Sequence, residues 1–149
     1  MITLDLIKIR SAKEAISQAK DAANKAKEAL RPILEDANLM GEVLRNFLQF
    51  LTTRSEVMNA DKRKQFLFII VYLFCPSSLL GDAMPRGFRE RLRVLLHVDA
   101  PTVISNNIAD LLFLYNHYED FRTGVNDAYS YIAEEMHIES NDGWWTENK

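Results

Sequence analysis

Apolar residues between positions 12 and 51 recur at alternating steps of four and three, and no other feature of the sequence constrains the fold as strongly. The positions are Ala12, Ile16, Ala19, Ala23, Ala26, Leu30, Ile33, Ala37, Met40, Leu44, Phe47 and Leu51. This is the a/d spacing of helices that pack side by side. We therefore expect residues 1–54 to form an N-terminal helical arm, after a short lead over residues 1–10.

Two features divide this arm. Pro32 lacks a backbone donor and clashes with the preceding helical turn, so we expect a kink or a break there. The seam before Pro32 consists mostly of alanine, which buries little area, so residues 11–31 should be stable only when docked on another helix. That helix can lie in the same chain or in a partner subunit. We expect a homo-oligomer, most simply a homodimer, that forms through the arm.

The rest of the chain is also expected to be helical. The run of residues 66–75 is apolar on all sides, which fits either a buried strand or a buried helix. No second strand candidate exists to pair with it, and a lone strand would leave its backbone groups unsatisfied, which favours a helix ended by Pro76. Apolar residues at helical spacing between Phe121 and Ile132 predict a final helix.

The expected fold is therefore all-α: a helical bundle with a long, Pro-kinked arm. The expected organisation is an arm over residues 1–54, a helical core over residues 55–139, and a polar tail over residues 140–149 that contains Trp144 and Trp145. Charges at Asp5, Lys8 and Arg10 interrupt any signal-peptide core. The longest apolar run is far below the roughly 20 residues that span a bilayer, so we expect a cytoplasmic protein with no membrane partner.

Charge is distributed unevenly along the chain. Residues 1–98 carry 16 Lys and Arg against 11 Asp and Glu, whereas residues 99–149 carry 2 against 10. Such asymmetry can mark a nucleic-acid-binding half followed by an acidic tail. It can equally mark two halves of one fold, or of two subunits, that attract each other.

Residues 86–117 contain the pattern L-x-x-L-L-H-V-x-x-P-T-V-I-S-N-N-I, in which two apolar-faced helical segments flank a short break. This segment resembles helix-turn-helix DNA-binding domains through Val98, Thr102, Val103 and Ser105. His97 stands where that family usually has glycine, and one extra residue separates Thr102 from Ser105. The resemblance covers about a quarter of the chain. It implies double-stranded DNA as a partner and a role like that of a transcription regulator.

The resemblance assigns roles to polar residues in and near this segment. Thr102, Ser105, Asn106 and Asn107 near the start of the second helix are expected to contact base edges. Phosphate contacts are expected from Arg86, Arg89 and Arg93, and from the cluster Lys62, Arg63 and Lys64. The second helix itself carries no Lys or Arg from residue 102 to residue 117, so its neighbours must supply the cations.

Other chemistry has little support in the sequence. The histidines are twenty residues apart with no metal-ligand companion, and phosphate-loop and nucleophile motifs are absent, so we expect no enzyme, metal or cofactor. Two hypotheses therefore stand: a DNA-binding helix-turn-helix protein, and a helical interaction or assembly protein without a nucleic-acid role.

Overall fold

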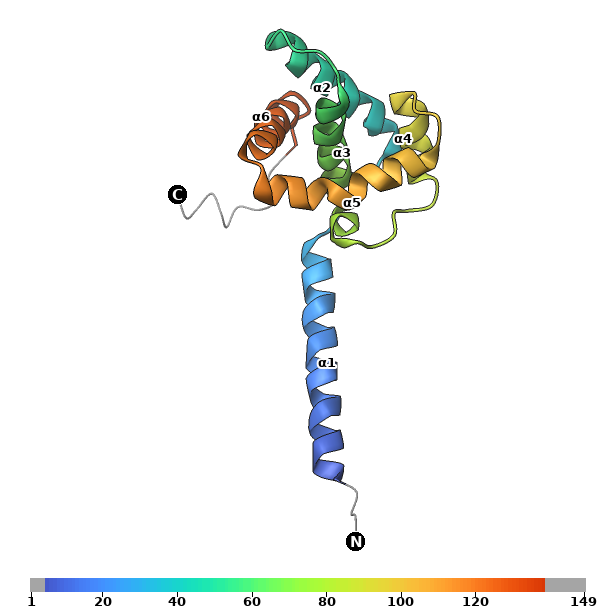
Figure 1. The fold of residues 1–149 in the computed structure, drawn as a ribbon, viewed down its shortest axis with the longest axis vertical. Coiled ribbons are helices and arrows are strands. Elements are labelled where there is room, and N and C mark those ends of the chain that lie inside the picture. The colour runs from blue at the N-terminus through green and yellow to red at the C-terminus, as the bar shows by residue number, and fades with distance from the viewer. Residues whose placement is uncertain (1–4, 139–149) are drawn as a thin grey trace. The chain divides into compact units, whose positions relative to one another are not determined.

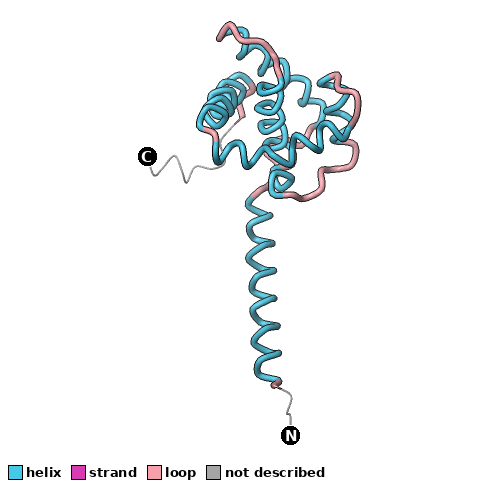
Figure 2. Tube along the Cα trace, viewed as in Figure 1, coloured by secondary structure: helices cyan, strands magenta, loops and turns pink. Residues whose placement is uncertain are grey.

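The computed structural model describes residues 5–138, and over this range the protein is all-helical (Figures 1 and 2). This confirms the expected fold class. The chain divides into two compact units, residues 1–31 and residues 32–149. The boundary between them lies well before residue 54, because the second half of the expected arm belongs to the larger unit. The expected polar tail with Trp144 and Trp145 lies outside the described residues.

The smaller unit contains one helix, α1 (Leu6–Ala29). Its first turn is capped by the side chain of Asp5, which accepts a hydrogen bond from the Lys8 amide at 3.0 Å. The helix ends before Pro32, and the next helical residue is Ala37. A proline disfavours helical geometry in the residue before it, which explains why the chain breaks here instead of forming one bent rod. No residue of α1 is buried.

The larger unit begins with a short 3-10 helix, η1 (Ala37–Leu39), followed by α2 (Met40–Thr53). One face of α2 is buried, including Val43 and Phe47, which are fully inaccessible. Phe47, with Met40 and Leu51, continues the four-three spacing of the arm, but here a core covers these residues. The same sequence period thus leads to an exposed helix before Pro32 and a core helix after it.

The centre of the larger unit is α3 (Ala60–Phe74), which packs against α2, α5 and α6 (Figure 1). Asn59 caps it by accepting a hydrogen bond from the Lys62 amide at 2.8 Å. The helical interpretation of the apolar run is confirmed, and nine of its residues are buried. Pro76 then opens a second 3-10 helix, η2 (Pro76–Leu80). Burial raises the pKa of the Cys75 thiol, as expected of an inert core cysteine.

Three further helices complete this unit: α4 (Phe88–Leu96), α5 (Pro101–His117) and α6 (Glu119–Glu135). α5 packs against α3, α4 and α6, so it crosses the unit as a second central element (Figure 1). Tyr118 separates α5 from α6 in an extended conformation, and the two helices contact each other. Across residues 5–138, no helix has the length and apolar character needed to cross a membrane.

Candidate nucleic-acid interface

The expected helix-turn-helix segment forms two packed helices, α4 and α5, joined by a turn at residue 97. His97 adopts the left-handed conformation at φ 56° and ψ 41°, which glycine enters most easily. A glycine at position 97 would adopt this conformation without strain. Val98 follows and is buried, with 9% of its surface exposed.

Arg93 braces the turn. Its Nε donates to both carboxylate oxygens of Glu90 at 2.9 Å, and its Nη1 donates to the Val98 carbonyl at 3.3 Å. These hydrogen bonds hold the pKa of the Glu90 carboxyl below its usual range. The Arg93 guanidinium is therefore already hydrogen-bonded within the protein, so less of it is available to a phosphate than the sequence-based prediction assumes.

The start of α5 has no side-chain cap, although two residues with capping side chains, Asp99 and Thr102, lie beside it. The N-cap residue is Ala100, no side chain caps the helix, and Pro101 is its first residue. Neither Asp99 nor Thr102 therefore caps α5. Proline suits this place because the first helical amide has no intrahelical partner, and its φ angle is already helical.

Replacing His97 by glycine should raise the free energy of unfolding by about 0.5–1 kcal/mol. The left-handed conformation strains a residue that has a Cβ, and the free energy gained by relieving this strain exceeds the entropic cost of the more flexible glycine in the unfolded chain. The His97 side chain is exposed, so little packing is lost. Urea denaturation measures the difference. His97→Ala is the control, since alanine keeps the strain; equal stability of the two variants would contradict the explanation.

The four candidate base-contacting residues separate into two pairs. Thr102 and Asn106 lie exposed on the outward side of α5. Ser105 and Asn107 are partly covered, and the Asn107 side-chain amide donates to the Val103 carbonyl at 2.9 Å. Asp110 is exposed one turn after Asn106 on the same side of α5. Its negative charge therefore lies beside the exposed pair, Thr102 and Asn106.

Arg89 of α4 lies against the start of α5. Its Nη1 donates a hydrogen bond to the Ser105 hydroxyl at 2.9 Å, and both residues border a cavity of about 400 Å³ beside η2. This contact brings one candidate phosphate-binding residue next to the candidate base-contacting residues. It also gives α5 the neighbouring cation that its own sequence lacks.

The remaining candidate phosphate residues lie elsewhere. Arg86 precedes α4, which begins after the left-handed Gly87, and it lines a separate cleft with Glu35 and Arg91. Lys62 forms an ion pair with Glu56. Because Arg86 lies outside the helix and Arg93 braces the turn, the three arginines do not form the continuous row that their spacing suggests.

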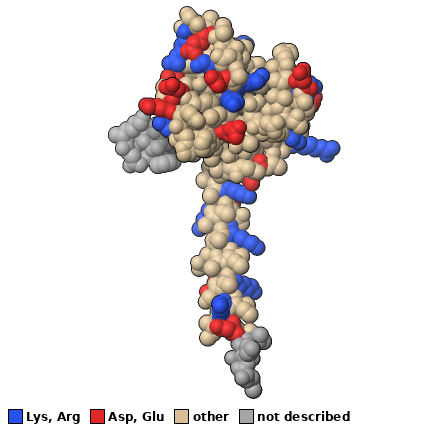
Figure 3. All heavy atoms as spheres, viewed as in Figure 1, with Lys and Arg blue, Asp and Glu red and all other residues tan. Residues whose placement is uncertain are grey.

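Lys62 and Lys64 are near the opposite end of α5. They line a cavity with Leu114 and Tyr118, whereas Arg89 contacts Ser105. Nine residues separate Ser105 from Leu114, and at 1.5 Å per residue this is about 14 Å of helix. The lysine cluster and the arginines therefore do not form one compact basic site. On the face drawn in Figure 3, acidic and basic side chains of residues 32–138 are intermixed.

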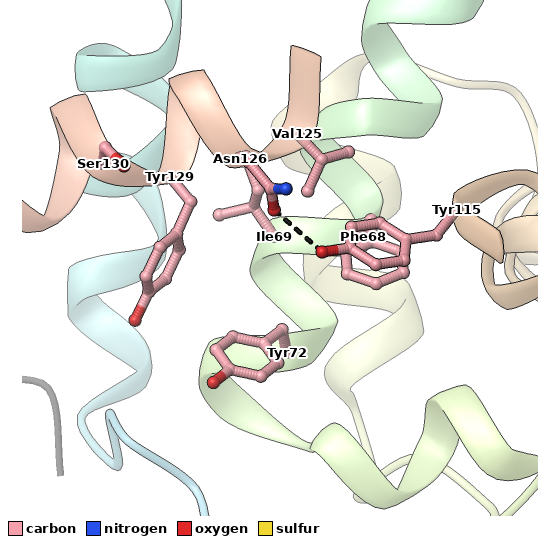
Figure 4. A pocket seen from close by; sticks show the side chains of 8 residues that line it. All are labelled: Phe68, Ile69, Tyr72, Tyr115, Val125, Asn126, Tyr129 and Ser130. Carbon is pink, nitrogen blue, oxygen red and sulfur yellow. Dashed lines mark hydrogen bonds between the residues drawn. The ribbon is translucent and has the colours of Figure 1, made fainter. Parts of the chain in front are cut away.

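An aromatic cavity between α3, α5 and α6 has no counterpart in the sequence predictions (Figure 4). Its volume is about 460 Å³, and among the residues that the structure describes its lining includes Tyr72, Tyr115, Asn126 and Tyr129 but no Lys, Arg, Asp or Glu. The Tyr115 hydroxyl donates to Asn126 Oδ1 at 2.9 Å, and the Tyr115 ring stacks on Phe68 at 4.8 Å. Periodicity places these residues on helix faces but does not reveal that faces of three helices converge.

Within residues 5–138, no group of three or more His, Cys, Asp or Glu side chains is placed to hold a metal ion. A scan against models of protein families, a search of curated proteins and a search of solved structures each give no match.

Proposed function

We propose that the protein binds double-stranded DNA through α4 and α5. The observation that carries the proposal is the Arg89–Ser105 hydrogen bond, which places a cation of α4 beside the polar start of α5. The left-handed turn at His97 supports it, because a short turn between two packed helices is what a helix-turn-helix requires.

In this mechanism the two helices have different tasks. Arg89 contacts a phosphate, which contributes affinity without sequence preference and falls with rising salt. Thr102 and Asn106 face outward and contact base edges in the major groove, where asparagine can bond adenine with two hydrogen bonds. Asp110 on the same side repels phosphates and weakens binding. Regulation of transcription would follow if the bound site lies near a promoter.

Fluorescence anisotropy with a mixed-sequence duplex at low salt tests this proposal. We expect binding at micromolar protein, and Arg89→Ala should weaken it and reduce the slope of log affinity against log salt by about one, the effect of losing one phosphate contact. Asp110→Asn should strengthen binding, because it removes a negative charge from the contact surface.

Arg45→Ala is the matched control. Arg45 is an exposed arginine of α2 paired with Glu42, so its loss changes the net charge equally but away from α5. Binding that Arg45→Ala weakens as much as Arg89→Ala would reflect general charge instead of a site. No binding at all would reject the DNA proposal.

A second candidate is a helical interaction or assembly protein without a nucleic-acid role. One observation favours it: α1 has 24 residues with a regular apolar stripe, and none of them is buried. Homo-oligomerisation through α1 would cover this stripe. Assembly through α1 is itself compatible with DNA binding, since a DNA-binding protein can also assemble through a separate helix. The two candidates differ in whether DNA is bound, and the anisotropy test distinguishes them.

A further inference from the structure

The apolar face of α1 is wider than the seam of a two-stranded coiled coil. The motif A-K-(E or D)-A occurs three times at a spacing of seven, beginning at Ala12, Ala19 and Ala26. In heptad terms the apolar positions are a, d and g. They are occupied by Ile9, Ile16, Ala23 and Leu30 at a, by Ala12, Ala19 and Ala26 at d, and by Ala15, Ala22 and Ala29 at g. A face of three positions in seven suits the core of a bundle, whereas two in seven suits a pair.

This face is exposed from Ile9 to Ala29, and Leu30 at its end is half-buried. Ile9 and Ile16 keep 60% and 58% of their surface accessible, values unusual for isoleucine in a covered position. Polar rows border the face: Lys13, Lys20 and Lys27 on one edge, and Ser11, Gln18 and Lys25 on the other. Glu14, Asp21 and Glu28 lie on the opposite side of the helix. These polar rows limit the width of the apolar surface that a partner helix can cover.

Two such helices would bury too little surface for a stable pair. At 1.5 Å per residue, the 24 residues of α1 extend about 36 Å, and a contact strip about 10 Å wide gives roughly 700 Å² in total for a pair. Stable interfaces bury about 1,200 Å² or more. Alanine at the centre of the face adds little apolar area per residue. A helix in a bundle contacts two neighbours, which doubles the area that it buries.

We propose that α1 assembles with the α1 helices of other copies of this chain into a bundle of more than two helices. Identical helices suit this face because the A-K-(E or D)-A motif repeats with one period, so small residues meet at every heptad layer. Alanine at d and g lets the helix backbones approach closely, and the Ile and Leu side chains at a fill the bundle core. This inference deepens the second candidate above and is independent of DNA binding.

Sedimentation equilibrium of the full-length protein tests the inference. We expect a mass at least three times the 17.2 kDa of one chain. Ala19→Glu, at the centre of the face, should lower the mass to that of one chain. Ser17→Glu is the matched control, since it adds the same charge two residues away on the polar side, and it should leave the mass unchanged.

Circular dichroism of both variants separates loss of assembly from unfolding of the larger unit, whose helical signal should persist. A wild-type mass of two chains would overturn the bundle, and a mass of one chain would overturn self-association through α1. An assembly that survives Ala19→Glu would show that another surface holds the copies together. None of these results depends on the anisotropy titration, so failure of this inference and failure of DNA binding are distinguishable.

Discussion

Replacing Leu92 by alanine is expected to lower the free energy of unfolding by about 3 kcal/mol, the usual cost of deleting a buried leucine side chain. Leu92 is fully inaccessible and lies in the middle of α4, where it joins Phe88 in anchoring this nine-residue helix to the core. The variant would leave a cavity beneath α4, because the surrounding side chains collapse only partly. Urea denaturation followed by far-ultraviolet circular dichroism measures the loss.

Val94→Ala is the control for this prediction. Val94 belongs to the same helix but keeps 57% of its surface exposed, so its truncation should change stability by less than about 0.5 kcal/mol. A loss as large as that of Leu92→Ala would contradict core burial as the cause, because alanine has a higher helix propensity than valine. If α4 positions Arg89 as proposed, Leu92→Ala should also weaken DNA binding.

Gly124→Ala is expected to destabilise the protein by about 1–2 kcal/mol, although alanine favours helices by about 1 kcal/mol over glycine. A Cβ atom at position 124 in α6 would lie 2.5 Å from Gln65 Nε2 and 2.8 Å from Gln65 Cδ. Gln65 is buried in α3 with 6% of its surface exposed, so its amide has little room to move away. Overpacking should therefore outweigh the gain in helix propensity.

A double-mutant cycle and a matched glycine test this explanation. With Gln65→Ala in the background, Gly124→Ala should become neutral or stabilising, because the overlapping amide is gone. Gly41 in α2 is the matched site: it is exposed, and the nearest atom to an added Cβ is Leu95 Cδ1 at 4.0 Å. Gly41→Ala should therefore stabilise the protein by up to about 1 kcal/mol. Equal effects at the two glycines would reject the packing argument.

The sequence predicts most of the helices correctly because their signals are local. Asn59 and Pro76 border the apolar run that forms α3, and both act on the backbone immediately beside them. The apolar spacing from Phe121 to Ile132 likewise predicts α6. Pro32 indicates an interruption of the arm, although sequence alone left a kink and a break as alternatives.

The candidate site was harder to predict because it depends on contacts between helices. Arg86, Arg89 and Arg93 are three and four residues apart, and a helix covering all three would place them on one face. The structure begins α4 after Gly87, orients Arg93 toward Glu90 and brings Arg89 to Ser105. Each of these differences arises from a neighbour that sequence spacing does not identify.

Sequence alone determined the helical character of the chain, the positions of its breaks at the prolines, and the period of its apolar faces, because these depend on neighbouring residues. Tertiary structure alone decided which faces are covered. The same four-three spacing gives α1 no buried residue, whereas in α2 it includes the buried residues Met40, Phe47 and Leu51. The reason is physical: periodicity specifies which side of a helix is apolar, whereas burial requires another surface, and only the fold places that surface.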